Sequence, residues 1–196
     1  MALTEATRRQ LAALVRARGY ERREEPFRLT SGGWSHDYVD AKVAVADGEA
    51  LRRVSQAVVD LVEERFDAVG GPTLGADALA AGVAMVSGAR WFSIRKEAKG
   101  HGRRAWVEGA RLAAGDRIVM VDDVVSTGGS LLRALDRVTE LDVVVIAATA
   151  LVDRGPEAGR RFAQRGIDWR PLLTWADLDI DPLAAPAAHD DEGPVR

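Results

Sequence analysis

The residues with the clearest chemical potential lie between positions 118 and 130. A run of four apolar residues, 118–121, ends in Asp122 and Asp123, and a turn of hydroxyl residues and glycines, 126–130, follows. Glycines let the backbone wrap closely around an anion, successive N–H groups can point at it, and the start of a following helix adds partial positive charge. The segment therefore predicts a cradle for a phosphate group at the end of a buried strand.

The side chains of this segment fit a phosphorylated sugar. Ser126, Thr127 and Ser130 can donate hydroxyl hydrogen bonds to the phosphate, and Asp122 and Asp123 can hold ribose hydroxyl groups with a bound Mg²⁺. An isolated pair of aspartates would more often be a solvated turn, but the whole arrangement is more specific than the pair. It has neither the Gly-Lys-Ser/Thr ending of a P-loop nor the spacing of a dinucleotide fingerprint.

A second group of charged residues lies within residues 94–109. The chain has only three lysines against 24 arginines, and two of the lysines fall in this short stretch. Arg95, Lys96, Lys99 and His101 gather cationic or protonatable groups there, with glycines at 100 and 102 as flexible points. Such a loop can close over a pyrophosphate leaving group and neutralise it, although a solvated basic loop would have a similar composition.

Two more sites follow predicted strands. Residues 71–75 form a glycine-rich turn in which Thr73, Leu74 and Gly75 offer backbone donors to an anion, although such turns are common in any α/β fold. Arg154 follows the apolar run 143–150, and a guanidinium group can fork two N–H donors to a carboxylate or to carbonyl oxygens. The alternative for Arg154 is a surface position at the start of a helix.

The elements that must position these groups alternate along the chain. Apolar runs predict strands at 68–71, 91–95, 117–121, 143–150 and 172–174, and helical stretches are predicted at 76–86, 130–140 and 157–165. This alternation favours a parallel sheet with helices on both faces. Ahead of it we predict a helix at 4–18 capped by Thr4, a turn at 31–33, an extended run at 38–45 and a helix at 49–65.

Composition narrows the class of protein. The chain has 196 residues, of which 47% are hydrophobic and 29% charged, as expected for a globular protein with one sizeable core. A formal charge of −3 argues against a nucleic-acid-binding surface, and the absence of cysteine excludes disulfides, zinc fingers and thiol catalysis. No secretory signal or membrane-spanning run is visible, so we expect a cytoplasmic protein.

The segment VMVDDVVSTGGS, 119–130, resembles the phosphoribosyl pyrophosphate (PRPP) motif of the type I phosphoribosyltransferases. Further similar segments occur in the family's order and point to its orotate branch: FRLTSGGWSHDYVDAK at 27–42, VGGPTLGADALAAGVA at 69–84, IRKEAKGHGRRAWVEG at 94–109 and LVDRGPEAG at 151–159. The resemblance covers about residues 20–178. It implies an α/β fold in one domain, 1–180, with a small hood at roughly 1–45, a core at roughly 46–180 and a tail at 181–196.

The resemblance also implies a reaction and its residues. Orotate would receive the phosphoribosyl group of PRPP with release of pyrophosphate, with Mg²⁺ held mainly by the substrate and with Asp122 and Asp123 as candidate protein ligands. The implied PRPP contacts are Arg95, Lys96, Lys99, His101, Asp122, Asp123, Val124, Val125, Ser126, Thr127, Gly128, Gly129 and Ser130, with Thr73, Leu74 and Gly75 as pyrophosphate loop. The implied catalytic residues are Lys99, Lys96, Arg95, His101, Asp122 and Asp123, and the implied orotate contacts are Ser126, Arg154, Tyr38 and Thr30.

The family also implies a homodimer in which the loop at 95–109 reaches the neighbouring active site. Two alternatives remain open. One is transfer to another base, because Thr30 stands where many members carry lysine and Val39 replaces a second aromatic. The other is a non-catalytic regulator that senses PRPP and binds nucleic acid. The regulator predicts a basic surface or an added DNA-binding domain, and the retained Lys96, Lys99 and His101 favour catalysis instead.

Overall fold

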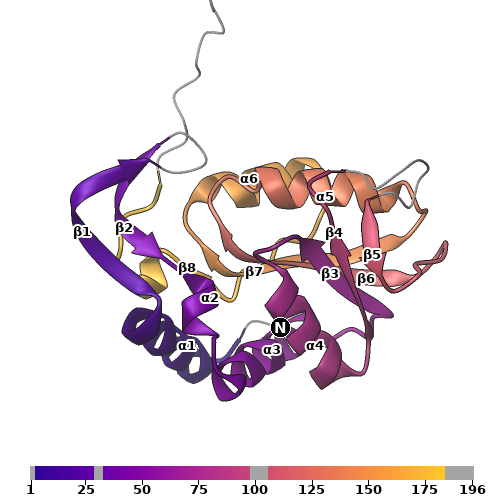
Figure 1. Ribbon diagram of the computed structural model, residues 1–196, viewed down its shortest axis with the longest axis horizontal. Helices are drawn as coiled ribbons and strands as arrows, with labels where there is room; N and C mark the ends of the chain where they lie inside the picture. Colours follow the sequence, from indigo (N-terminus) through magenta and orange to yellow (C-terminus); the bar gives the residue numbers. More distant parts are fainter. Residues whose placement is uncertain (1–2, 29–32, 98–105, 184–196) are drawn as a thin grey trace, which may run out of the picture.

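The computed structural model describes residues 3–28, 33–97 and 106–183. Within them the chain forms a six-stranded sheet, ordered β5-β4-β3-β6-β7-β8, and a separate two-stranded sheet, β1-β2 (Figure 1). The strands of the large sheet are β3 (Ala68–Pro72), β4 (Arg90–Ile94), β5 (Val107–Gly109), β6 (Arg117–Val125), β7 (Val144–Asp153) and β8 (Leu173–Thr174). The predicted parallel sheet is confirmed for all of these strands except the edge strand β5, which pairs with β4 in the antiparallel direction.

Helices cover both faces of the large sheet, as predicted. The helices α3 (Gly48–Val62) and α4 (Asp77–Ser87) lie on one face, and α5 (Gly129–Thr139) and α6 (Pro156–Gln164) on the other (Figure 1). The residues of β6 alternate between these faces: Val119 and Val121 belong to one hydrophobic core cluster, Ile118 and Met120 to the other. Because both faces are buried, β6 reads as a continuous apolar run in the sequence.

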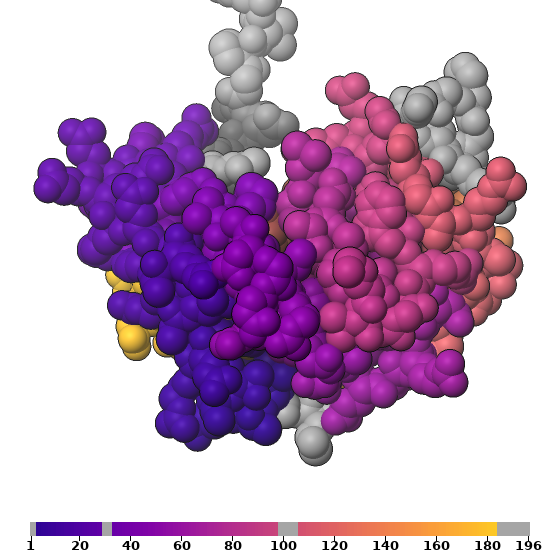
Figure 2. Space-filling model, turned by 60° about the horizontal axis from the view of Figure 1, so that its bottom comes forward, coloured from indigo at the N-terminus to yellow at the C-terminus, as the bar shows by residue number. Residues whose placement is uncertain are grey.

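The N-terminal hood consists of α1 (Glu5–Arg18), β1 (Tyr20–Arg28), β2 (Trp34–Val39) and α2 (Ala41–Ala44). Thr4 caps α1 as predicted, because its side chain accepts a hydrogen bond from the Thr7 N–H at 3.1 Å. Figure 2 shows the indigo and violet hood side by side with the magenta core. Along β1 nearly every residue is exposed, so the hairpin stands out from the rest of the fold.

The structure departs from the predicted elements at several boundaries. The extended run expected at 38–45 is wrong in its second half, because the Asp40 side chain accepts the Lys42 and Val43 N–H groups and starts α2. The strand β1 was missed, since a strand exposed on both faces has no apolar alternation. Helix α3 ends at Val62, earlier than predicted, and β6 runs four residues beyond Val121.

The short 3-10 helix η1 (Ala176–Leu178) follows β8. Of the predicted tail, residues 181–183 are described and the remainder lies outside the described residues. That residues 1–180 form one domain remains a prediction. In the described ranges, no helix is both long enough and apolar enough to cross a membrane.

Candidate functional site

The predicted phosphate cradle is a tight turn between β6 and α5. Strand β6 ends at Val125, the turn follows, and α5 begins at Gly129, so the turn leads directly into the N-terminus of a helix. Gly128 has φ 75°, and a Cβ at this position would lie 3.0 Å from the Phe162 ring. Only glycine fits both the left-handed conformation and the close contact with α6. Val125 is buried and Val124 is half-buried, so a ligand would meet their backbone rather than their side chains.

The two carboxylates at the end of β6 have different environments. Asp122 is buried, and its Oδ1 accepts the Asp123 N–H at 2.9 Å. Asp123 is partly exposed, and its Oδ1 accepts the Val124 N–H at 2.7 Å. Burial raises the pKa of Asp122 well above its usual range, and the negative charge of Asp123 raises it further. Asp123 is therefore the better placed of the two to meet a ligand from solvent.

Lys42 of the hood reaches this acidic pair and was not singled out as a site residue from the sequence. Its Nζ lies 3.4 Å from Asp123 Oδ2 and 3.6 Å from Asp40 Oδ1. Burial lowers the pKa of Lys42, but the nearby charges of Asp123 and Asp40 outweigh it, and the net pKa is raised. Lys42 is thus a charged lysine at the site. Lys42 and Asp123 are separated by 81 positions, so no local pattern in the sequence indicates their contact. The only signal in the sequence was the scarcity of lysine.

The predicted pyrophosphate turn lies against the same carboxylate. Strand β3 pairs with β6 only as far as Gly70 and Met120, so the end of β6 stands beside the turn that follows β3. A Cβ at Gly75 would lie 2.6 Å from Asp123 Oδ1, a contact that any side chain would disrupt. The predicted glycine turn and the predicted acidic pair are therefore brought together.

The structure narrows the backbone donors of this turn. The Thr73 N–H donates to Ile94 O at 2.9 Å, and Pro72 has no N–H. The earlier expectation that Thr73 offers its amide to an anion is wrong for this arrangement, because that donor is already used within the sheet. The amides of Leu74 and Gly75 are engaged by no hydrogen bond among the described residues, and their binding of an anion remains a prediction.

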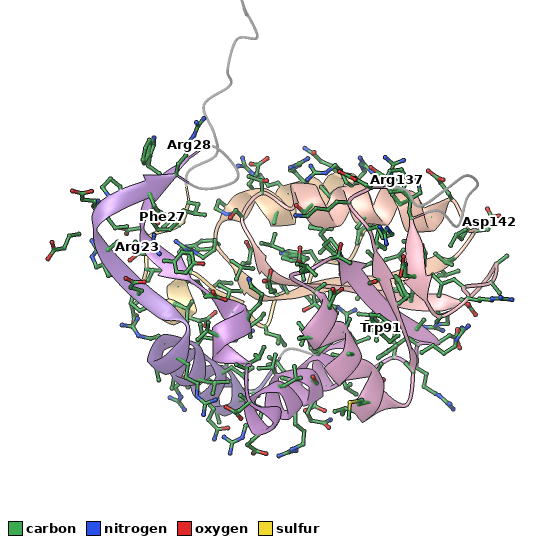
Figure 3. All side chains as sticks on the ribbon, viewed as in Figure 1. Arg23, Phe27, Arg28, Trp91, Arg137 and Asp142 are labelled. Atoms are coloured by element: carbon green, nitrogen blue, oxygen red, sulfur yellow. The ribbon has the colours of Figure 1, made fainter. Side chains whose placement is uncertain are left out.

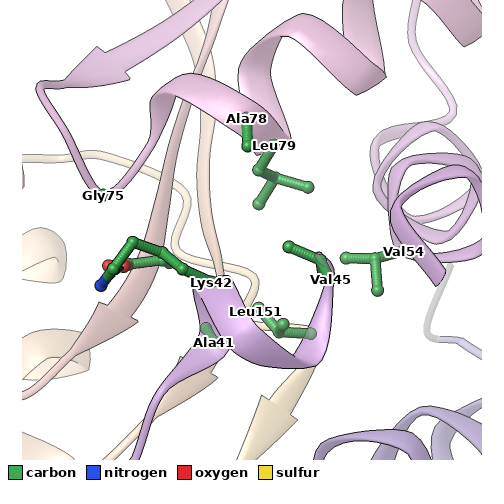
Figure 4. A pocket seen from close by; sticks show the side chains of 9 residues that line it. Ala41, Lys42, Val45, Val54, Gly75, Ala78, Leu79 and Leu151 are labelled. Atoms are coloured by element: carbon green, nitrogen blue, oxygen red, sulfur yellow. Dashed lines mark hydrogen bonds and ion pairs between the residues drawn. The ribbon is translucent and has the colours of Figure 1, made fainter. Parts of the chain in front are cut away.

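A small pocket lies between α2, α3 and α4 beside Lys42 and Gly75 (Figure 4). Its lining residues are Ala41, Lys42, Val45, Val54, Gly75, Ala78, Leu79, Asp123 and Leu151. The polar residues Lys42 and Asp123 border one end and aliphatic residues form the rest. The pocket therefore borders the point at which the hood, the glycine turn and the acidic pair meet.

Arg154 does not lie at the surface, as the alternative reading of the sequence proposed. It is 2% exposed; its Nη1 donates to Asp37 O at 2.9 Å and its Nη2 to Ser35 Oγ at 3.4 Å, so it joins the end of β7 to strand β2 of the hood. Burial lowers the pKa of Arg154, although the charge of Asp37 opposes the shift. The Nε atom is buried and has no hydrogen-bond partner among the described residues. Its contact with orotate remains a prediction.

The hood side of the site is built from polar and aromatic contacts. The buried Asp37 carboxylate accepts hydrogen bonds from Tyr20 Oη and Arg22 Nη1, both at 2.9 Å. The Tyr38 ring lies edge-on to the Phe27 ring, with 5.4 Å between the ring centroids. The Arg23 guanidinium lies over both rings, and Arg23 and Phe27 can be found on β1 in Figure 3. Tyr38 is thus already occupied by partners within the hairpin.

Val39 and Thr30 are the two positions whose residue types left transfer to another base open. Val39 is 9% exposed and packs in the hydrophobic core, so the missing aromatic at this position changes packing and not a surface that a base could touch. Thr30 lies outside the described residues.

The basic loop is described only at its two ends. Arg95 Nη1 forms an ion pair with Glu108 Oε1 at 2.6 Å, and the Arg95 N–H donates to Trp106 O at 2.8 Å. These contacts close the base of the loop between β4 and β5. Lys96 is described, whereas Lys99 and His101 lie outside the described residues, so their expected roles remain predictions.

Comparison with known proteins decides the family. The model of the phosphoribosyl transferase domain matches residues 45–166, which span the glycine turn, the acidic pair and the phosphate cradle. The chain belongs to the phosphoribosyl transferase family. The matched residues exclude most of the hood, whereas the relatives described next are matched over most of this chain.

Whole relatives place the chain among the orotate phosphoribosyltransferases of this family. It is 38% identical to the orotate phosphoribosyltransferase of Aquifex aeolicus over 178 residues, 87% of this chain and 97% of the relative. It is also 38% identical to that of Methanothermobacter thermautotrophicus, over 90% of this chain and 96% of the relative. The crystal structure of the Mycobacterium tuberculosis orotate phosphoribosyltransferase in complex with PRPP superposes with a TM-score of 0.74 and 29% identity, covering 89% of this chain and 99% of that one.

Proposed function

We propose that this protein transfers the phosphoribosyl group of PRPP to orotate in pyrimidine biosynthesis, producing orotidine 5′-phosphate and pyrophosphate. The observation that carries the proposal is the convergence at the end of β6. The phosphate turn, the carboxylates of Asp122 and Asp123, the Gly75 turn and Lys42 all meet there. Relatives named orotate phosphoribosyltransferase, matched over almost their full length, support orotate as the acceptor.

The site supports a displacement at the anomeric carbon. Ser126 to Ser130 would anchor the 5′-phosphate, and Asp123 would hold the ribose hydroxyl groups. A ring nitrogen of orotate would form the new bond to the anomeric carbon and lose its proton to solvent, while the bond to pyrophosphate breaks and its electron pair leaves with the pyrophosphate. The transition state has oxocarbenium character, so no protein nucleophile is required. Holding sugar and base in line is the main contribution of the chain.

The residues present fit Mg²⁺ as an additional ligand of the substrate. Carboxylate oxygens are the protein ligands that Mg²⁺ prefers, and Asp123, the more exposed of the pair, would supply them at the sugar end of the site, with the buried Asp122 behind it. Among the described residues no cluster of three or more potential ligands exists, so substrate oxygens would complete the coordination. When bound, the ion would neutralise the charge that develops on pyrophosphate. Lys42 would keep the Asp123 carboxylate oriented toward this position.

The orotate side would be formed by Arg154 with Ser126, Tyr38 and Thr30. Arg154 carries a buried charge whose hydrogen bonds go to a backbone carbonyl and a serine hydroxyl, and its Nε is unpaired among the described residues. An anionic base would supply a direct carboxylate partner, because the hydrogen bonds of this guanidinium among the described residues go to Asp37 O and Ser35 Oγ. Arg154 is thus suited to the carboxylate of orotate.

The basic loop would complete the active site of a homodimer. We propose that the loop at 95–109 reaches the neighbouring subunit, where Arg95, Lys96, Lys99 and His101 neutralise the departing pyrophosphate. The Lys99→Ala variant should lose on the order of 100- to 1,000-fold in turnover and still bind PRPP. Turnover assays with a parallel PRPP titration measure both, and unchanged turnover would refute the assignment. We expect the enzyme in the cytoplasm.

The acceptor is tested by a panel of bases. Purified protein is incubated with PRPP and Mg²⁺ together with orotate, uracil, adenine or hypoxanthine, and pyrophosphate release is followed. We expect release with orotate. Faster release with another base would replace orotate as the substrate. Release with none, together with tight PRPP binding, would support a sensor of PRPP instead of an enzyme.

A further inference from the structure

Two arginine side chains approach the phosphate turn from outside it. Arg161 of α6 is half-buried, and its Nη1 donates to Thr127 O at 2.9 Å. Arg133 of α5 is exposed, and its Nη2 donates to Ser130 Oγ at 3.3 Å. One arginine therefore contacts the backbone of the turn, and the other contacts one of its hydroxyl groups.

Both guanidinium groups converge on Gly129, the first residue of α5. A Cβ at Gly129 would lie 3.3 Å from Arg133 Nη1, 3.6 Å from Arg161 Nη1 and 3.7 Å from Thr127 Oγ1. Two positive charges and a hydroxyl group thus gather within van der Waals reach of one point. The start of a helix carries partial positive charge itself, so cations placed there are unfavourable unless an anion joins them.

The other arginines of these two helices, Arg160 and Arg137, have acidic partners. Arg160 pairs with Glu157 at 2.5 Å and Arg137 with Glu140 at 4.0 Å, and Arg165, which follows α6, pairs with Asp136 at 2.5 Å. Among the described residues, Arg133 and Arg161 form no ion pair with a carboxylate. These are therefore the two arginines of α5 and α6 whose charge the fold leaves uncompensated, and both are at the phosphate turn.

We propose that Arg133 and Arg161 are additional binding residues for the 5′-phosphate, supplying positive charge to the dianion held by the turn. The proposal rests on the proposed function in one respect, that residues 126–130 hold this phosphate. Arg161 also braces the Thr127 carbonyl, and Arg133 orients the Ser130 hydroxyl group toward the anion. Because both lie at the phosphate end of the substrate, they strengthen binding of PRPP and leave the chemical step unchanged.

The test uses ribose 5-phosphate as the probe, which needs neither a base nor turnover. Its Kd is measured by calorimetry for the wild type, Arg133→Ala, Arg161→Ala, the double variant and Arg161→Gln. Glutamine keeps a donor for Thr127 O without the charge. Arg160→Ala is the matched control, because Arg160 is adjacent on α6 and its charge is already paired.

We expect Arg161→Ala and Arg161→Gln each to weaken binding about 10-fold, Arg133→Ala about 3-fold, and the control by less than about 2-fold. The double variant should raise the KM for PRPP at least about 10-fold with little change in kcat. Thermal melts confirm that each variant is folded. If the double variant does not fold, Arg133→Ala and Arg161→Gln carry the test.

Two results would overturn the proposal. One is a double variant that binds ribose 5-phosphate like the wild type. The other is wild-type binding by Arg161→Gln, which would reduce Arg161 to a brace for the turn. The proposed function can fail separately: a wild type that binds ribose 5-phosphate through these arginines but transfers to no base would refute the transferase and leave the phosphate contacts in place.

Discussion

The phosphate side and the hood side of the site are built in different ways. The phosphate side is a strand, a turn and a helix that follow one another in the chain, and β6 is buried on both faces. The hood side depends on an exposed two-stranded hairpin that polar contacts attach to the core, such as the hydrogen bond from Arg154 to Asp37, 117 positions apart. A two-stranded hairpin is marginally stable without such support.

This difference suggests a division of labour. A turn fixed by buried strands presents its donors in one arrangement before any ligand binds, which suits an invariant phosphate. A hairpin held by a few hydrogen bonds can shift at small cost, which suits a side that admits the base and releases the nucleotide product. Substitutions on the phosphate side should therefore affect PRPP binding, and those on the hood side should affect the base.

The largest effect is expected in the phosphate turn. Gly128→Val should lower kcat/KM for PRPP by about 100-fold or more, since it displaces several hydrogen bonds to a charged group at about 1.5–3 kcal/mol each. The side chain would be forced into a φ of 75° and against the Phe162 ring. Gly88→Val is the control, because Gly88 has φ 76° with no atom within 4 Å of its Cβ position. Steady-state kinetics and thermal melts compare the two. Equal loss of activity in both variants would show that backbone strain alone is responsible.

The next effect should appear on the hood side. Arg154→Ala should raise the KM for orotate about 10- to 100-fold and that for PRPP by less than about 3-fold, because the proposed contact with the orotate carboxylate is lost. Arg22→Ala provides the control, since Arg22 also contacts Asp37 but its side chain is 63% exposed, and exposed pairs contribute little. Both KM values are measured by varying each substrate in turn. A larger rise for PRPP than for orotate would break the proposed division.

Lys42 joins the two regions, so its removal should give an intermediate result. Lys42→Met should raise the KM for PRPP about 5-fold, because the Asp123 carboxylate loses its nearest positive partner. Val43→Ala, at the neighbouring exposed position of α2, should behave like the wild type. Initial rates at several PRPP concentrations provide the measurement. A wild-type KM in Lys42→Met would limit Lys42 to a surface contact.

The smallest effect concerns stability. Burial raises the pKa of Asp122, so the folded protein favours the neutral acid, and stability is lost as pH rises through that pKa. Asp122→Asn removes this cost. Its melting temperature should exceed that of the wild type at alkaline pH by roughly 2–4 °C for each kcal/mol gained, and the two should agree at acidic pH, while activity falls. Thermal melts across pH measure this, and a constant difference would exclude titration of Asp122 as the cause.

The sequence predicted the phosphate side much better than the hood. The apolar run and the glycine turn of residues 118–130 carry their own local signals, and the structure places them as a strand, a turn and a helix. Strand β1 lacks apolar alternation because solvent covers both of its faces, and α2 starts only because Asp40 caps it. The contacts of Lys42 with Asp123 and of Arg161 with Thr127 join distant segments, so no local pattern could reveal them.

The transfer of the phosphoribosyl group from PRPP to orotate is tested best by detecting the nucleotide product itself. Wild-type protein is incubated with PRPP, orotate and Mg²⁺, and nucleotides are identified by mass spectrometry, with a chelator in a parallel sample. We expect orotidine 5′-phosphate when all three are present and its loss when Mg²⁺ is chelated. Pyrophosphate release without this nucleotide, or its undiminished formation in the presence of the chelator, would refute magnesium-dependent transfer to orotate.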